Sequence, residues 1–208
     1  MTDRAVTRRI DGGVDLLDVA GADGVVFARG TEGLAGRGVA ATVDVDGITP
    51  ESIAAVQRAL AERRGEDEVD RPGTGPVAFV SLPFEPGGRA RFIIPSEVVG
   101  VDDDGTRWRT VIGAGAPPSS DAAGTDGVAG VADEPRPTGF RVENTRDPRD
   151  WLATVAAATA AIDAGAFDKV VLAREVTVTA DAPIPRAKLL RRLRARFPGC
   201  FTFSVGEL

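Results

Sequence analysis

The sequence contains no histidine and no tyrosine among its 208 residues. Without histidine, the chain can form no Ser-His-Asp triad, no Cys-His pair and no imidazole metal site, so acid-base chemistry would use Lys, Asp, Glu or Cys. Cys200 is the single cysteine, which excludes an internal disulfide and is typical of a reducing compartment. We therefore expect a cytoplasmic protein in which Cys200 is a small buried residue rather than a nucleophile.

Long apolar runs are also missing. No stretch approaches the roughly eighteen apolar residues of a membrane-spanning helix, and the N-terminal MTDRAVTRRIDGG lacks the apolar core of a secretion signal. The net charge of -6 and the pI near 4.8 predict repulsion from phosphate backbones and anionic membrane surfaces. We expect neither nucleic acid nor membrane as a partner.

The content of 43% hydrophobic residues is enough for a folded core. Residues 24–29 and 39–45 are rich in β-branched side chains and predict a hairpin around the glycine-rich turn GTEGLAGRG. That turn lacks the Gly-Lys-Ser/Thr ending of a phosphate-binding loop. Thr49 and Pro50 open a predicted helix that ends near Gly65.

Three strand-like runs follow, at 76–84, 91–95 and 97–101, and the last is predicted to pair with residues 106–113 across DDDG. In that turn Asp102, Asp103 and Asp104 are adjacent rather than spaced as in a calcium-binding loop. We interpret these acidic residues as turn residues.

The stretch from 113 to 137 is rich in Gly, Ala, Pro, Ser and Asp, which predicts a flexible insertion. A helix capped by Asp147 should follow, and then a long strand from 167 to 179. The last predicted elements are a helix over 186–196 with a solvated arginine face and a strand containing Phe201 and Phe203. Because this strand runs straight to the end of the sequence, we expect a truncated domain.

Two segments carry a resemblance to a known family. WLATVAAATAAIDAGAFDKVVLAREVTV and the following LLRRLRARFPGCFTFSV closely resemble the first segment of the catalytic domain of isochorismate synthases, members of the chorismate-utilising enzymes related to anthranilate synthase component I. Upstream, FARGTEGLAGRG and VAFVSLPFEPGGRARFIIP are similar to the N-terminal hairpin of that family and the strand after it.

The resemblance implies an α+β fold in which antiparallel sheets are flanked by helices, here truncated after its first half. Residues 1–112 would be the N-terminal part of the chorismate-utilising fold, 113–138 a flexible low-complexity insertion, and 139–208 the incomplete start of the chorismate-binding segment. It also implies an isomerase that converts chorismate to isochorismate with Mg²⁺, for menaquinone or siderophore biosynthesis. The acid, the magnesium ligands and the remaining substrate contacts would lie in a missing C-terminal half, which leaves this chain inactive alone.

Lys169 matches the lysine that, in isochorismate synthases, removes a proton from the water attacking C2 of chorismate. Relatives that add ammonia commonly carry glutamine there, so lysine favours water as the nucleophile. A lysine acts as a base only when neutral, which requires a pKa lowered from about 10.4; the neighbouring Val170, Val171 and Leu172 could supply the desolvation. Two alternatives stay open: a salicylate synthase, which releases pyruvate, and a non-catalytic fragment or interaction module.

Overall fold

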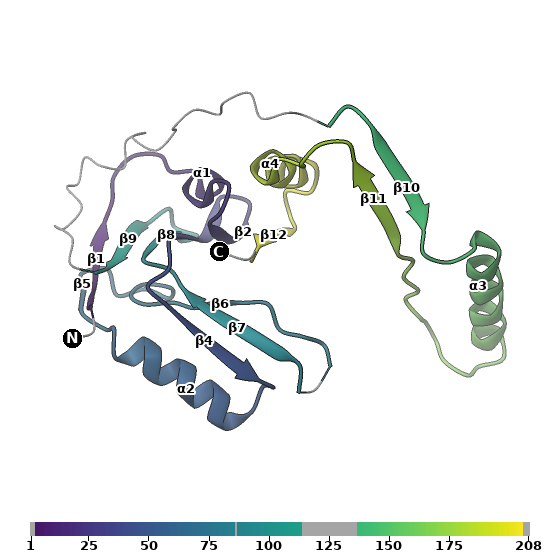
Figure 1. Cartoon of the computed structure of the whole chain (residues 1–208), viewed down its shortest axis with the longest axis horizontal. Coiled ribbons are helices and arrows are strands. Elements are labelled where there is room, and N and C mark those ends of the chain that lie inside the picture. Colours follow the sequence, from purple (N-terminus) through teal and green to yellow (C-terminus); the bar gives the residue numbers. More distant parts are fainter. Residues whose placement is uncertain (1–2, 86, 114–136, 206–208) are drawn as a thin grey trace. The chain divides into compact units, whose positions relative to one another are not determined.

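The computed structural model describes residues 3–85, 87–113 and 137–205 (Figure 1). These residues form two compact units. The larger unit combines residues 3–113 with 186–205, and the smaller unit comprises residues 137–185. The predicted flexible insertion falls almost entirely on residues 114–136, outside the described residues. Each unit is a mixture of helices and mainly antiparallel strands.

A seven-stranded sheet dominates the larger unit, in the order β12-β2-β3-β8-β9-β1-β5. Its neighbouring strands are antiparallel, except that β1 and β5 run parallel. The strands are β1 (Ala5–Arg9), β2 (Val25–Arg29), β3 (Glu32–Arg37), β5 (Glu66–Asp67), β8 (Glu97–Val101), β9 (Arg107–Ile112) and β12 (Phe201–Ser204).

Two helices cover one face of this sheet, α1 (Leu16–Ala20) and α4 (Arg186–Arg196), which lie together in Figure 1. Leu17 of α1 and Leu190 of α4 share a buried cluster with Val26 and Ala28 of β2. Burial of such aliphatic side chains stabilises the fold by about 1.5–3 kcal/mol each. The C-terminal helix is therefore part of the core built by the N-terminal strands.

The second layer of the larger unit is a three-stranded antiparallel sheet in the order β4-β7-β6, with a helix packed on it. Its elements are β4 (Ala41–Asp46), β6 (Phe79–Val80), β7 (Arg89–Ile94) and α2 (Pro50–Ala61). Thr49 caps the start of α2, as predicted, and the Ser52 hydroxyl accepts in turn from the Thr49 N–H, which completes a capping box. The helix ends at Ala61, one turn before the predicted Gly65.

The predicted hairpin between residues 24–29 and 39–45 is wrong. β2 pairs with β3, which lies inside the stretch interpreted as the turn, and β4 belongs to the other sheet. Gly30, at φ 61°, makes the tight turn between β2 and β3. Gly36 allows a close approach, since a Cβ there would lie 2.5 Å from Pro95. These glycines permit a tight turn and close packing within a strand, whereas the sequence-based prediction assigned the whole glycine-rich stretch to a turn.

The hairpin of β8 and β9 across the acidic turn is confirmed. In this hairpin Trp108 lies directly opposite Gly100, and its ring occupies the space that a side chain at position 100 would need. The Trp108 indole N–H donates to the Gly73 carbonyl at 3.2 Å. The large ring is thus buried with its polar atom satisfied.

The smaller unit contains a two-stranded antiparallel ribbon of β10 (Phe140–Asn144) and β11 (Val176–Ala180), with α3 (Pro148–Asp163) between them in sequence. Asp147 caps α3 through the Arg149 N–H at 2.8 Å, as predicted. No described side chain in this unit is buried. The predicted strand from 167 to 179 forms only over β11, because β10 is too short to pair with the earlier residues.

The helix predicted over 186–196 and the last strand are confirmed as α4 and β12, which pairs with β2. The arginine face of α4 is only partly solvated, because Arg191 and Arg194 form ion pairs with Asp18 and Asp15 of the α1 region. Among the helices of the described ranges, none has the length and apolar character needed to cross a membrane.

Candidate functional site

Lys169 lies in the smaller unit, in the irregular segment of residues 166–175 between α3 and β11. Its side chain is exposed. Within the described ranges no hydrogen bond or ion pair involves it. The structure therefore presents the predicted base to solvent on a stretch of chain without regular backbone pairing.

The neighbours expected to desolvate Lys169 are themselves exposed. Val170 is 44% and Val171 91% accessible, and only Leu172 is half-buried. A lysine pKa falls when burial disfavours the ammonium form or when another cation stands close by. The described residues around Lys169 do not supply that burial, so a role as a base requires a covering surface, whether protein or substrate. The catalytic role of Lys169 stays a prediction.

Side-chain hydrogen bonds join the two strands of the β10–β11 ribbon at both of its ends. At one end Asp181 accepts hydrogen bonds from the Thr138 N–H at 2.9 Å and the Thr138 hydroxyl at 2.7 Å, and these bonds hold the pKa of the Asp181 carboxyl below its usual value. At the other end the Thr145 hydroxyl donates to the Glu175 carbonyl at 3.1 Å. Lys169 precedes Glu175 in the chain and therefore lies outside the part of the ribbon that these hydrogen bonds hold together.

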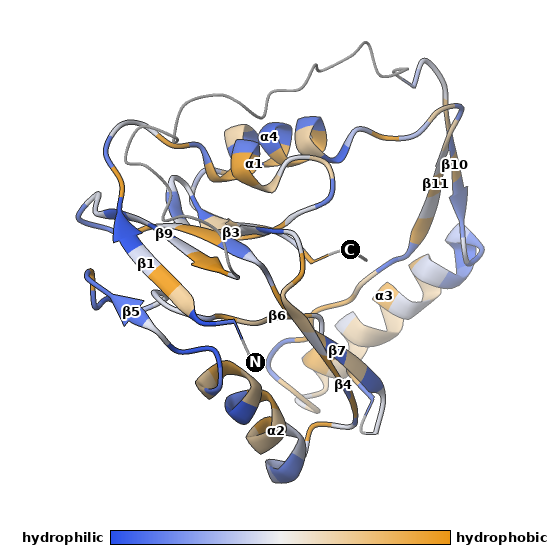
Figure 2. Cartoon of the chain, turned by 60° about the vertical axis from the view of Figure 1, so that its left-hand side comes forward, coloured by the Kyte–Doolittle hydropathy of each residue, from blue (hydrophilic) through white to orange (hydrophobic). Residues whose placement is uncertain are grey.

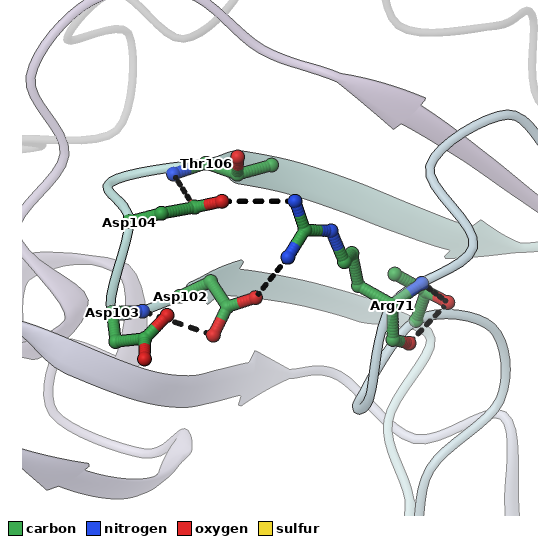
Figure 3. A network of polar contacts seen from close by, with 6 residues as sticks. Arg71, Asp102, Asp103, Asp104 and Thr106 are labelled. Carbon is green, nitrogen blue, oxygen red and sulfur yellow. Dashed lines mark hydrogen bonds and ion pairs between the residues drawn. The ribbon is translucent and has the colours of Figure 1, made fainter.

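The acidic turn between β8 and β9 is the one place in the described residues where three or more metal-ligand side chains gather. Figure 3 shows Arg71 reaching across it: its guanidinium donates to Asp104 at 2.8 Å and to Asp102 at 3.4 Å. The Thr106 N–H also donates to Asp104, and these hydrogen bonds together with Arg71 keep the pKa of Asp104 below its usual value.

These carboxylates do not fit the Mg²⁺ that the family resemblance implies. A magnesium ion needs free oxygen ligands in near-octahedral geometry, whereas a guanidinium cation already lies against Asp102 and Asp104. The Asp102 carboxylate also accepts from the Asp103 N–H, which is a bond internal to the turn. The interpretation of Asp102, Asp103 and Asp104 as turn residues agrees with this geometry.

Cys200 is exposed, which corrects the expectation that it is buried. It lies in a cleft of about 240 Å³ beside α4 and β12. The residues lining this cleft are Leu190, Leu193, Phe197, Cys200, Phe201, Thr202 and Phe203. The sequence showed the alternating phenylalanines of β12, but alternation alone could not show that both remain accessible, at 57% for Phe201 and 62% for Phe203.

A comparison with known protein families identifies part of the chain. Residues 122–207 match the family model of chorismate binding enzymes. This match includes Lys169 and extends through α3, β11, α4 and β12, and it supports a chorismate-utilising enzyme. No curated protein and no solved structure matches the chain.

Proposed function

We propose that this chain contributes to an isochorismate synthase, in which water adds at C2 of chorismate and the C4 hydroxyl is lost. The observation that carries the proposal is the chorismate-binding match over residues 122–207, which includes the FDKVVLAR motif around Lys169. The lysine at this position is the residue that the resemblance associates with members of the family that use water as the nucleophile. The coarser statement, a chorismate-utilising enzyme, rests on the match itself.

In the proposed reaction the neutral amine of Lys169 takes a proton from the attacking water. A bond forms between the water oxygen and C2, the ring double bonds shift, and the C4 oxygen leaves with a proton from an acid. Lys169 must be uncharged to act as the base, and desolvation favours the neutral amine of a lysine. Since the side chain is exposed, we propose that bound chorismate and the surface that covers it provide the desolvation. Mg²⁺ belongs to the proposal only through the family resemblance.

A product assay on the protein in its complete natural form tests this proposal. Chorismate and Mg²⁺ are supplied with and without an ammonium salt, and the products are separated by chromatography. Isochorismate as the sole product supports the proposal. Salicylate with an equal amount of pyruvate would identify the salicylate-forming alternative, and an aminated product would contradict water as the nucleophile. No conversion under any condition would contradict enzymatic function.

A non-catalytic interaction module is the second candidate, and one observation favours it. The smaller unit, which carries Lys169, buries none of its described side chains, whereas a two-stranded ribbon needs a hydrophobic partner for stability. The apolar face of the ribbon, with Phe140 60% and Val142 63% accessible, is the kind of surface that binds other proteins. If chorismate binding were absent in calorimetry while the protein still formed a complex through this ribbon, the second candidate would hold.

A further inference from the structure

The irregular segment of residues 166–175, which carries the predicted base, is held by hydrogen bonds at its two ends. At its start, the Ala166 N–H donates to the Ala161 carbonyl of α3 at 2.9 Å. At its end, the Thr145 hydroxyl donates to the Glu175 carbonyl at 3.1 Å. Between these two anchors the segment makes no hydrogen bond to another described residue.

The spacing of the two anchors leaves the segment little slack. α3 has 16 residues, so its length is about 24 Å. The chain leaves the C-terminal end of α3 and returns to Thr145, which lies just before the N-terminal end of the same helix (Figure 1). The nine residue steps from Ala166 to Glu175 cover at most about 30 Å when fully extended. The segment is therefore nearly extended while both anchors hold.

α3 offers the returning segment no hydrogen bond within the described residues beyond the one at Ala166. Figure 2 shows hydrophilic residues at the start of α3 and mainly apolar ones along the rest of the helix. The hydroxyls in that apolar part, Thr154 and Thr159, donate back to carbonyls of the helix itself at 2.8 and 3.0 Å. Because apolar contacts are non-directional, the directional restraint at the C-terminal end of the segment comes from Thr145.

Thr145 continues the pairing of the ribbon where the backbone pairing ends. The last backbone pair joins Asn144 of β10 to Val176 of β11, and the next pair in this register is Thr145 with Glu175. After β10 the chain turns toward Asp147, the N-cap of α3, and a side-chain hydroxyl reaches the Glu175 carbonyl. A substitution of Thr145 can thus remove this link without removing a backbone hydrogen bond of the ribbon.

We propose that Thr145 is a positioning residue for Lys169, a role that rests on the proposed function. Its hydroxyl fixes the C-terminal end of the extended segment, and this restraint limits the positions that the Lys169 amine can take relative to the attacking water. A displacement of a reacting group by about 1 Å can cost on the order of 100-fold in rate. Thr145 acts through Lys169 and not on the substrate.

The anchor can be tested without an activity assay, because the chain contains only two lysines, Lys169 and Lys188. A lysine-specific endoprotease is added to the whole chain, and cleavage after each lysine is followed by mass spectrometry. Thr145→Val keeps the shape of the side chain but lacks the hydroxyl. Because proteolysis follows the population of the open form, this variant should be cleaved after Lys169 at least about threefold faster, with no change after Lys188.

Thr145→Ser keeps the hydroxyl and should be cleaved after Lys169 at the wild-type rate. Thr154→Val is the matched control, because it removes another hydroxyl-to-carbonyl hydrogen bond of the same unit, one that lies within α3, and it should also leave this rate unchanged. Equal cleavage after Lys169 in the wild type and in Thr145→Val would overturn the proposal.

In the complete natural protein, Thr145→Val should lower kcat with chorismate about three- to tenfold, the population shift that one hydrogen bond can produce. The dissociation constant of chorismate should change little. The decisive readout is the same substitution in Lys169→Ala, where it should lower kcat no further, because the group that it positions is gone. An equal loss on both backgrounds would show a merely structural role and would overturn the proposal.

The activity assay separates failure of the positioning role from failure of the proposed function. An active wild type whose kcat is unaltered by Thr145→Val would contradict the positioning role alone. A wild type that converts no chorismate would contradict the proposed function, and Thr145 would then be an anchor with no base to position. Thr154→Val should leave kcat unchanged, as it does the cleavage rate.

Discussion

The guanidinium of Arg194 on α4 donates two hydrogen bonds to the carboxylate of Asp15, at 2.8 and 2.6 Å. Asp15 is also the N-cap of α1, where it accepts from the Leu17 N–H at 2.9 Å. One carboxylate therefore starts the N-terminal helix and holds the C-terminal helix beside it. The contact joins parts of the chain 179 residues apart.

This geometry predicts unequal costs for removing the two partners. Arg194→Ala should lower the free energy of unfolding by about 1 kcal/mol, since the pair is partly exposed and bidentate. Asp15→Ala should cost about 2 kcal/mol, because the helix cap is lost as well. Urea denaturation of both single variants and the double variant measures the coupling between them. Additive effects, with no coupling, would contradict a stabilising ion pair.

The same contact predicts a dependence on pH. The hydrogen bonds from Arg194 lower the pKa of the Asp15 carboxyl in the folded protein below its ordinary 3.8. A lowered folded pKa gives stability that is present above the unfolded value and is lost as pH falls through the folded value. The stability difference between wild type and Asp15→Asn should therefore be largest near neutral pH and shrink below about pH 4. A difference that stayed constant into strong acid would argue against the paired carboxylate.

The contact of Trp108 with Gly100 predicts a large effect from a small substitution. In Gly100→Ala the new Cβ would lie 2.2 Å from the Trp108 ring, so the ring must move out of a buried site, and overpacking of this kind costs about 1–3 kcal/mol. Gly13→Ala is the control, because a Cβ there meets nothing within 4 Å. Chemical denaturation of both variants tests the packing, and equal stabilities would contradict it.

The sequence predicted elements well where a local signal matched the final environment. Thr49 and Asp147 mark the starts of α2 and α3 because capping depends on neighbouring backbone groups alone. The strand expected over residues 167–179 formed only as β11, since residues of high β-propensity form a strand only where a partner strand is available. The glycine-rich stretch was predicted to be a turn, although part of it forms β3. The close packing of Gly36 on Pro95 is a tertiary contact, which a local sequence pattern does not reveal.

For the candidate site, the motif indicated Lys169 but not its surroundings. The side-chain period of a strand put Lys169 on a mixed polar face, whereas the residue lies on an irregular exposed segment. Desolvation depends on what packs around a side chain, and the apolar neighbours Val170 and Val171 stay accessible.

The final prediction concerns the catalytic role of Lys169 in the complete protein. Lys169→Ala should lower kcat at least about 100-fold, the usual contribution of a general base, while the dissociation constant for chorismate changes little. Lys169→Gln is the sharper variant, because glutamine resembles the ammonia-using relatives and cannot accept a proton from water. Lys188→Ala is a matched control, since the chain contains only these two lysines and Lys188 lies on α4. We expect kcat to rise with pH in the wild type, since the neutral amine is the active form, and this rise to disappear in both Lys169 variants. Wild-type kcat with an unchanged pH profile in Lys169→Gln would show that Lys169 is not the base.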